Sequence, residues 1–579
     1  MKERGQTRRS FLSKSALGLT GLALARASAG RGPSRPPNVI LIMTDDQGYG
    51  DLSCTGNPIL RTPNMDKLYR ESVRLENFHV SPTCSPTRAA LMTGHYSNRT
   101  GVWHTIMGRS ILLRDEITAG QIFAANGYRT GVFGKWHLGD NYPSRPQDRG
   151  FQETLVHGGG GVGQTPDYWG NDYFDDTYFK NGVPHKCRGY CTDVFFKAAL
   201  RFIEENRNRP FFCYLPTNAP HGPYRVPEKY AEPYKKPGVP NPNFYGMIAN
   251  IDWNLGKLLT RLQELGLYEN TIVIFMTDNG TAAGFRGGRG REPVGYNAGM
   301  RGTKGSQYDG GHRVPCFIRW PAGGLLGGRA VKHITAHVDI LPTLIDLCGL
   351  KPPADIKFDG VSLRPLLQNP DCKWPDRILV VDSQRIEYPE KWRKSAVMSD
   401  RWRLIDGKEL YDMTVDPGQR HDVAGRYPDV VKRLREAYEK WWADISPRFD
   451  LYARIALGDP AENPSRLTCH DWHGRRVPWH QGAIRRGLVA NGFWAVEISR
   501  PGTYEFALRW FPREEDKVIE AKEARLKIGS FEASKQIEKG AVEVTFRVPL
   551  KPGKAKLQTW FIEANGRSRG AYFVYVKRL

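Results

Sequence analysis

The sequence has no apolar run long enough to cross a membrane, no low-complexity segment and no long internal repeat. Because a spanning helix needs about 20 consecutive apolar residues, we expect no membrane span. No nucleic-acid-binding motif accompanies the basic residues, so we expect no nucleic-acid partner. Acidic residues are in the minority, with 61 Asp and Glu against 84 Lys and Arg and a net charge of +23. This excess attracts anionic partners and suits a sulfated polymer, but charge alone does not identify the partner.

Cysteine is scarce, with nine residues in a chain of 579. An odd number leaves at least one cysteine without a partner inside the chain. In an exported protein some of them can pair, and Cys187 and Cys191 are the obvious local candidates. Each of the others has to be examined for a different role.

The first 29 residues resemble an export signal. Arg8-Arg9 precedes Phe11-Leu12, an apolar run follows over residues 15–25, and Ala27-Ser28-Ala29 offers a cleavage site. The arginine pair resembles a bacterial twin-arginine signal. A disordered basic tail is the alternative, but the order of charged, apolar and small residues favours export. Cleavage after Ala29 leaves a net charge of about +18.

The pattern after this signal predicts a large α/β domain at residues 36–375. Four apolar runs end in polar residues, as buried parallel strands do. They begin at Asn38, Arg129, Phe211 and Thr271, with helical patterns at 191–206 and 245–265 between them. Strands that alternate with helices predict a central sheet flanked by helices, with ligands beyond the carboxyl ends of its strands.

Two smaller units are expected after this domain. Short strands at 378–382 and 402–406 and a charged amphipathic helix at 427–442 predict an α+β subdomain over 376–446. Residues 450–579 alternate apolar and polar side chains between Gly and Pro, which predicts an antiparallel β-sandwich. This sandwich either binds carbohydrate or completes the wall of an active site as a structural cap.

Polar pairs follow two of the predicted strands. Asp45-Asp46 follows the first strand, and Asp278-Asn279 follows the fourth. Carboxylate and amide oxygens are the ligands that Ca²⁺ and Mg²⁺ prefer. Asp and Asn are also common in turns at strand ends, so either pair alone indicates little. Two pairs at equivalent strand ends favour a metal site.

The segment from Cys84 to Gly94 contains Cys-x-Pro-x-Arg followed by a helical run and Thr-Gly. A lone cysteine is usually a small buried apolar residue, but here it lies in a polar loop. Pro86 fits an early position of the helix that follows. A helix start attracts anions, and Arg88 adds a charge that can form two hydrogen bonds to an oxyanion.

At these residues the chain resembles the type I, formylglycine-dependent sulfatases of the alkaline phosphatase superfamily, whose hallmark is this cysteine motif. The other family blocks match in order at Asp45-Asp46, Gly134-Lys135-Trp136-His137, Pro220-His221, Asp278-Asn279-Gly280, Gly302-Thr303-Lys304 and residues 401–417. One block alone is weak, whereas the ordered set over residues 36–446 is specific. One departure is Asp309, where many relatives have Glu. The resemblance implies an alkaline-phosphatase-like mixed sheet.

The resemblance also implies that a separate maturation enzyme oxidises Cys84 to formylglycine. One hydroxyl of the hydrated aldehyde would bind a divalent cation, which we expect to be Ca²⁺, with Mg²⁺ as the alternative. The implied metal ligands are Asp45, Asp46, the modified Cys84, Asp278 and Asn279. A metal-bound hydroxyl loses its proton more easily, so it would attack the ester sulfur at neutral pH.

The implied catalytic residues are Cys84, Arg88, Lys135, His137, His221 and Lys304. Lys135, Lys304 and Arg88 would neutralise charge that develops in the transition state. His221 and Lys304 would bind sulfate and protonate the leaving oxygen. His137 would deprotonate the second hydroxyl, which releases sulfate. The structural alternative is that Lys135 and His137 are exposed loop residues and that Arg88 caps a helix. The matching family blocks favour a catalytic role for all three.

Other candidates have weaker signals. The segment Gly284–Arg301 contains Arg286, Arg289, Arg291 and Arg301 among glycines. It either recognises further sulfates or carboxylates of a polymer or is a solvated basic loop. His157 and the stretch Asp167-Tyr168-Trp169 either shape a sugar subsite or contribute to packing.

The sequence therefore predicts a periplasmic or secreted sulfatase that hydrolyses sulfate monoesters, which we expect on sulfated carbohydrate. A phosphoester hydrolase of the same superfamily is one alternative. An inactive protein that only binds sulfated glycans is another, although Cys84, Lys135, His137 and the metal ligands speak against it.

Overall fold

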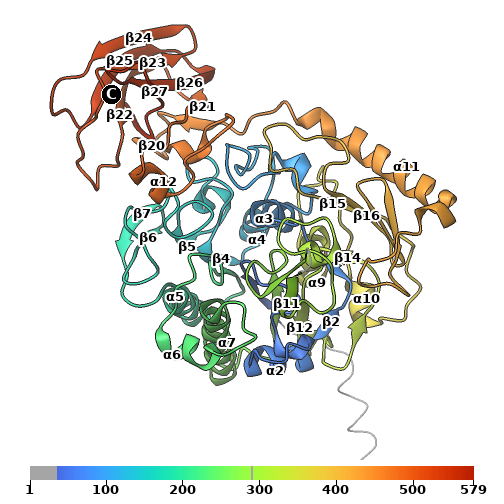
Figure 1. Cartoon of the computed structure of the whole chain (residues 1–579). Helices are drawn as coiled ribbons and strands as arrows, with labels where there is room; N and C mark the ends of the chain where they lie inside the picture. The colour runs from blue at the N-terminus through green and yellow to red at the C-terminus, as the bar shows by residue number, and fades with distance from the viewer. Residues whose placement is uncertain (1–34, 289–290) are drawn as a thin grey trace, which may run out of the picture.

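The computed structural model describes residues 35–288 and 291–579 (Figure 1). The expected export signal at residues 1–29 lies outside these ranges. A large α/β body contains most of the chain, helix α11 lies along one side of it, and the C-terminal strands form a separate lobe. None of the helices in the described ranges combines the length and the apolar character that crossing a bilayer requires.

A ten-stranded mixed sheet lies at the centre of the large body, in the order β13-β2-β12-β9-β1-β8-β4-β5-β6-β7. Its strands are β1 Asn38–Thr44, β2 Val73–Leu75, β4 Arg129–Lys135, β5 Glu153–His157, β6 Thr177–Lys180, β7 Val183–Lys186, β8 Phe211–Pro216, β9 Thr271–Thr277, β12 Cys316–Arg319 and β13 Ala330–Val331. Strands β9, β1, β8, β4 and β5 are parallel neighbours. The four predicted runs are therefore adjacent strands, and the mixed α/β sheet is confirmed.

Helices cover both faces of this sheet. They are α2 Pro63–Glu71, α3 Cys84–Thr93, α4 Ala119–Ala125, α5 Cys191–Glu205, α6 Glu228–Ala231, α7 Pro242–Glu264, α8 Asp309–His312, α9 Ile340–Cys348 and α10 Arg364–Gln368. Strand β1 alternates between two apolar clusters. Val39 and Leu41 join α3, α4, α9 and α10, whereas Ile40 and Ile42 join α2, α5 and α7. Because successive strand residues point to opposite faces, a strand covered on both sides must be apolar throughout.

Smaller sheets precede the C-terminal lobe in the chain. β3 Phe78–His79 pairs with β14 Thr335–Ala336, and β10 Phe285–Gly288 pairs with β11 Arg291–Gly295. A four-stranded antiparallel sheet contains β15 Leu379–Asp382, β16 Ser395–Met398, β17 Trp402–Ile405 and β18 Glu409–Asp412. Leu434 and Tyr438 of α11 Pro428–Ile445 pack against this sheet, as the predicted amphipathic helix requires.

The C-terminal lobe is a β-sandwich with one shared apolar core. One sheet contains β19 Ile455–Leu457, β21 Phe493–Ile498, β26 Gly553–Ile562, β23 Glu523–Ile528, β24 Phe531–Gln536 and β27 Ser568–Arg569. The other contains β20 Ser465–Thr468, β28 Phe573–Arg578, β22 Gly502–Arg509 and β25 Val544–Leu550, and α12 Gln481–Arg485 lies between the strands in sequence. The sandwich is not purely antiparallel, because β19 and β21 are parallel. The bounds given for the domains stay a prediction.

The local disulfide for which the sequence offered candidates does not form. Cys187 and Cys191 are both free. The Cys187 sulfur lies 3.6 Å from the His185 carbonyl oxygen. Cys191 is the first residue of α5, and its buried sulfur lies 3.8 Å from Thr192 Oγ1. Cys191 is part of the buried apolar core, whereas Cys187 is only partly buried.

Gly134 allows β4 to lie close to the end of β8, directly before Lys135. Its φ is +130°, and a Cβ there would lie 1.9 Å from the Pro216 carbonyl oxygen. We expect Gly134→Ala to destabilise the protein by about 3 kcal/mol or more, because backbone must move. Gly127→Ala is the matched control, since Gly127 has φ +80° but open space around it. Thermal unfolding of both variants tests this, and equal shifts would contradict it.

Candidate active site

Two neighbouring strand ends bring the predicted metal ligands together. Asp45 and Asp46 follow β1, and Asp278 and Asn279 follow β9. The Asp46 amide donates to Asp278 Oδ1 at 3.0 Å, and Asn279 Nδ2 donates to Asp46 Oδ1 at 3.0 Å. Ligand atoms of Asp45, Cys84 and Asp278 all lie within 4.8 Å of one another.

The prediction that Cys84 lies in a polar loop is wrong. Cys84 is the first residue of α3 and is only 2% exposed. Thr83 is extended, with φ −144° and ψ 156°, and Pro86 is compatible with the first turn because that turn has spare N–H groups. Burial raises the pKa of the Cys84 thiol, with Lys135 and Lys304 opposing. An unmodified Cys84 is therefore a poor nucleophile at neutral pH, because the thiolate is the reactive form.

Each of the three carboxylates is paired with one cation. Lys135 Nζ lies 2.6 Å from Asp45 Oδ2, and Arg88 Nη2 lies 2.7 Å from Asp278 Oδ2, with all four side chains fully buried. Lys304 Nζ lies 2.6 Å from Asp46 Oδ1. Buried ion pairs are seldom more stabilising than apolar packing, so their density here indicates a functional site.

The residues fit a divalent cation. Asp45 Oδ1 and Asn279 Oδ1 are buried and have no hydrogen-bond partner. Burial raises the pKa of Asp278 to about 7, and the neighbouring Asp45 adds to the shift. Unpartnered oxygens and mutually repelling carboxylates are what a bound Ca²⁺ or Mg²⁺ would stabilise.

The two predicted histidines lie near this group. His137 follows β4, its Nε2 lies 2.8 Å from the Thr105 carbonyl oxygen, and its buried Nδ1 has no partner. His221 Nε2 lies 3.8 Å from Asp46 Oδ2. Burial lowers the pKa of His221 to about 4, although Asp46 opposes this shift. The structure thus brings all ten predicted residues into one region, and their individual roles stay predictions.

The sandwich contributes two residues that the sequence analysis missed. His470 and Asp471 follow β20, and the His470 ring centroid is 6.4 Å from that of His137. His470 Nδ1 lies 3.0 Å from Asp471 Oδ1, and its buried Nε2 has no partner. The local pattern is a run of polar residues around Trp472, namely His470, Asp471 and His473, for which the sequence analysis predicted neither a strand nor a site.

The weaker candidates make contacts within the protein, and the choice between a sugar subsite and packing stays a prediction. Trp169 packs edge-on against Phe511 of the sandwich, with ring centroids 5.7 Å apart. Asp167 accepts hydrogen bonds from the Gly158 and Gly163 amides and so shapes the loop after β5. His157 Nδ1 is 2.9 Å from the Gly158 carbonyl oxygen.

The arginines of the segment Gly284–Arg301 differ in their surroundings. The Arg301 guanidinium lies 3.7 Å from the Tyr308 ring centroid and donates to the Tyr411 hydroxyl at 3.0 Å. Arg286 is exposed on β10. Arg289 lies outside the described residues, and the role of the loop stays open.

His79, Asp309 and His312 form a second group of side chains that could bind a metal ion, but they are hydrogen-bonded within the protein. His79 Nδ1 and His312 Nδ1 are 2.9 Å apart, and Arg403 donates to Asp309 Oδ1 at 3.0 Å. Arg403 also lies 3.2 Å from His79 Nε2. This cluster, which includes Asp309, joins the α/β body to the subdomain sheet.

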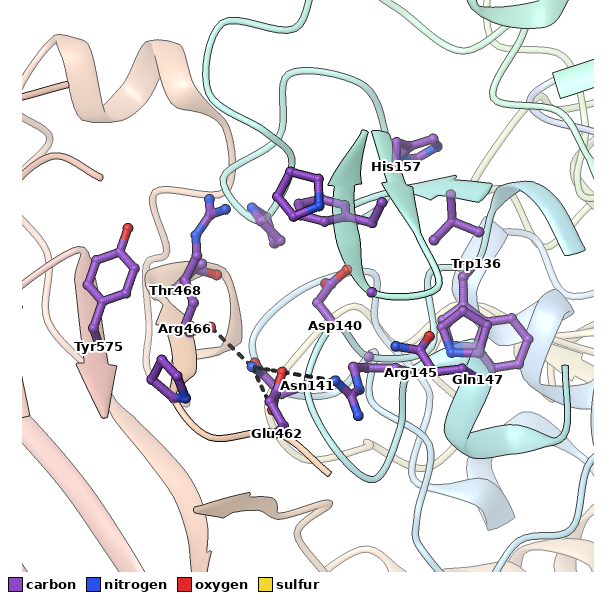
Figure 2. A pocket seen from close by; sticks show the side chains of 18 of the residues that line it. Trp136, Asp140, Asn141, Arg145, Gln147, His157, Glu462, Arg466, Thr468 and Tyr575 are labelled. Carbon is purple, nitrogen blue, oxygen red and sulfur yellow. Dashed lines mark hydrogen bonds and ion pairs between the residues drawn. The ribbon is translucent and has the colours of Figure 1, made fainter. Parts of the chain in front are cut away.

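A cavity of about 510 Å³ lies between the α/β body and the sandwich (Figure 2). Its charges are balanced. Arg145 lies 3.7 Å from Glu462, and Arg466 lies 3.7 Å from Glu514. Asn141 donates to Glu462 and to the Arg466 carbonyl oxygen, as the dashed lines show. This cavity is therefore a polar interface, which the Arg145–Glu462 pair crosses and in which Arg466 is paired within the sandwich.

Known proteins with similar sequences define the class. The sulfatase family matches residues 37–350, and the C-terminal part of N-sulphoglucosamine sulphohydrolase matches residues 303–443. The chain is 30% identical to steryl-sulfatase of Mus musculus over 545 residues, which covers 74% of this chain and 85% of the relative. It is 30% identical to arylsulfatase A of Homo sapiens over 479 residues, which covers 72% of this chain and 89% of the relative.

A solved structure agrees. The crystal structure of Ps i-CgsB in complex with k-i-k-neocarrahexaose matches with a TM-score of 0.64 and 27% identity, covering 72% of this chain and 95% of that chain. The fold and the sequence similarity are those of a sulfuric ester hydrolase in the alkaline phosphatase superfamily. The chain belongs to the sulfatase family. Residues 444–579 lie outside both matched family ranges.

Proposed function

We propose that this sulfatase hydrolyses sulfate esters on a sulfated carbohydrate, with formylglycine made from Cys84 as its nucleophile. The observation that carries the proposal is the position of Cys84 at the start of α3, within 4.8 Å of the Asp45 and Asp278 oxygens. The similarity to Ps i-CgsB, whose structure contains a neocarrahexaose, supports the substrate class.

The cofactor is proposed to be Ca²⁺. Asp45, Asp46, Asp278, Asn279 and the modified Cys84 would hold it, and the cation would supply positive charge and a Lewis acid. Arg88 orients Asp278 through the 2.7 Å ion pair and also donates to the Lys135 carbonyl oxygen at 2.8 Å. Arg88 therefore fixes the metal ligand and strand β4 together.

The other polar residues have roles that follow from their positions. Lys304 and His221 both lie beside Asp46 on the open side of the site, where Lys304 is 22% and His221 17% exposed. We infer that both bind the sulfate and that the proton for the leaving oxygen comes from Lys304, because a pKa of about 4 leaves His221 neutral. His137 is neutral, since burial holds its pKa well below the usual value, with Lys135 adding to the shift. Its free Nδ1 can therefore accept a proton from the side chain at position 84.

Export and maturation complete the proposal. The arginine pair and cleavage site in residues 1–29 support twin-arginine export to the periplasm or beyond. A formylglycine-generating enzyme is the proposed maturation partner. Burial of Cys84 and its raised pKa support the need for oxidation, because the unmodified thiol is protonated.

The mass of the tryptic peptide Leu75–Arg88, from protein produced with a maturation enzyme, tests the nucleophile. We expect the Cys84 thiol to be replaced by an aldehyde. Turnover of a sulfate ester and of the matching phosphate ester is measured on the same sample, and we expect sulfate to be preferred. An unmodified Cys84 in an active enzyme would refute the proposed nucleophile, and a preference for phosphate would favour the phosphoester hydrolase.

A further inference from the structure

We propose that the β-sandwich provides a second anion-binding subsite, which binds a sulfate or carboxylate group on the same glycan chain as the ester to be hydrolysed. The proposal rests on the sulfated-carbohydrate substrate proposed above. The subsite is a cavity of about 600 Å³ between the α/β body, the subdomain and the sandwich. We call it the cationic pocket, and its polar lining includes Arg385, Arg475, Arg476, Arg486, Trp479 and His480.

The charge of this pocket is not neutralised by the protein. Its lining contains four arginines and no acidic residue, and all four arginines are exposed. Within the described ranges, none of the four guanidinium groups is in a salt bridge or donates a hydrogen bond to another residue. The interdomain cavity of Figure 2 differs, because its arginines are paired with carboxylates. Like charges gathered without counter-charges repel, and an anionic ligand removes that repulsion.

The residue types match a sulfated sugar. A guanidinium group donates two parallel hydrogen bonds to a sulfate or carboxylate, which a lysine cannot do. Trp479 is 42% exposed, and its ring lies at a steep angle to His480 with centroids 4.5 Å apart. Ile106, Val477 and Leu488 complete the lining with apolar surface. An aromatic face beside several guanidinium groups suits a ring that is apolar on one face and charged at its edge.

The pocket shares a wall with the catalytic site. His104, Ile106 and Met107 line the pocket, and Thr105 between them accepts the hydrogen bond from His137 Nε2 at 2.8 Å. The Met107 amide donates to the His470 carbonyl oxygen at 3.0 Å. A ligand in the pocket and a sulfate beside His137 therefore lie on opposite sides of one short segment.

A second contact fixes the rim of the pocket to the site. The Thr165 amide donates to the Trp479 carbonyl oxygen at 3.1 Å, and Thr165 Oγ1 donates to the Pro478 carbonyl oxygen at 2.6 Å. A Cβ added to Gly161 would lie 3.3 Å from both Gln164 Nε2 and His221 Nδ1, so the same loop also contacts the sulfate-binding side. The preferred substrate is therefore an oligosaccharide with at least two anionic groups.

Binding is tested without turnover in a Cys84→Ala background. Isothermal titration with a carrageenan hexasaccharide, which carries sulfate only, and a chondroitin sulfate hexasaccharide, which also carries carboxylates, distinguishes the two anions. We expect Arg475→Ala/Arg476→Ala to weaken binding about tenfold or more, through lost charge-assisted hydrogen bonds. The control is Lys554→Ala/Lys556→Ala, which removes two exposed charges from another hollow of the sandwich. We expect less than about twofold change for the control.

The possible results distinguish a failure of the proposed subsite from a failure of the proposed sulfatase activity. Equal losses in the two double variants would mean only long-range attraction and would overturn the subsite. Failure of the parent protein to bind either hexasaccharide would overturn it as well. Turnover of a small aryl sulfate by the matured wild-type protein is measured in parallel. Absence of aryl sulfate turnover would refute the proposed activity. The binding measurements would still test whether the cationic pocket binds the glycan.

Discussion

Replacing Cys84 by alanine is expected to abolish hydrolysis of sulfate esters while the protein still folds. Cys84 is 2% exposed, and the substitution removes only its sulfur from the first residue of α3. Alanine is compatible with that position, so we expect a stability loss of about 1 kcal/mol. Loss of the nucleophile is expected to reduce kcat/KM by about 10⁴-fold or more. Steady-state kinetics on an aryl sulfate, with thermal unfolding on the same samples, measures both effects.

Two further variants make this result specific. Cys213→Ala removes another fully buried cysteine, in β8, and is expected to keep its activity. Cys84→Ser retains one hydroxyl but lacks the second hydroxyl from which sulfate can be eliminated. We expect it to accumulate a sulfated intermediate rather than turn over. Wild-type rates in Cys84→Ala would refute the proposed nucleophile.

Asp278→Asn is expected to remove the bound divalent cation and with it the activity. Asp278 accepts a hydrogen bond from the Asp46 amide at 3.0 Å and pairs with Arg88 at 2.7 Å. Asparagine retains the shape but supplies no negative charge, which the cation requires. We expect bound calcium, measured by mass spectrometry of the metal, to fall to background and kcat/KM to fall by about 10³-fold or more.

Asp382→Asn is the matched control for this variant. Asp382 is also buried, and burial raises its pKa to about 6, while Asn98 and Gln384 donate hydrogen bonds to it. It lies in β15, outside the site, so the metal content should not change. Full metal content in Asp278→Asn would show that the assignment of this ligand is wrong.

The sequence predicted the central sheet because burial on both faces leaves a continuous apolar run. Strand β1 shows the reason, since its alternate residues enter two different cores. The site was predictable for the same reason, because Asp45-Asp46 and Asp278-Asn279 each follow such a run. Adjacent parallel strands place these pairs at one edge of the sheet.

The missed features depend on contacts between distant segments. Nothing local to His470 predicts that it lies beside His137, because the contact requires the sandwich to dock on the segment that contains Met107. Cys84 was placed in a loop because Ser and Pro surround it, whereas the helix already begins at that residue. The four unpaired arginines of the cationic pocket come from two regions, at Arg385 and at 475–486.

The burial of Cys84 sets an order of events during biosynthesis. A second enzyme cannot reach a side chain that is 2% exposed, so the proposed oxidation would have to precede the completion of the fold. The wall beside the site is completed late, because β20, which leads to His470, pairs with β28 near the other end of the sandwich. Since domains fold in the order of their synthesis, the α/β body that buries Cys84 can fold before β28 is made. The proposed maturation would therefore have to act before the α/β body folds, which is earlier than the completion of this wall.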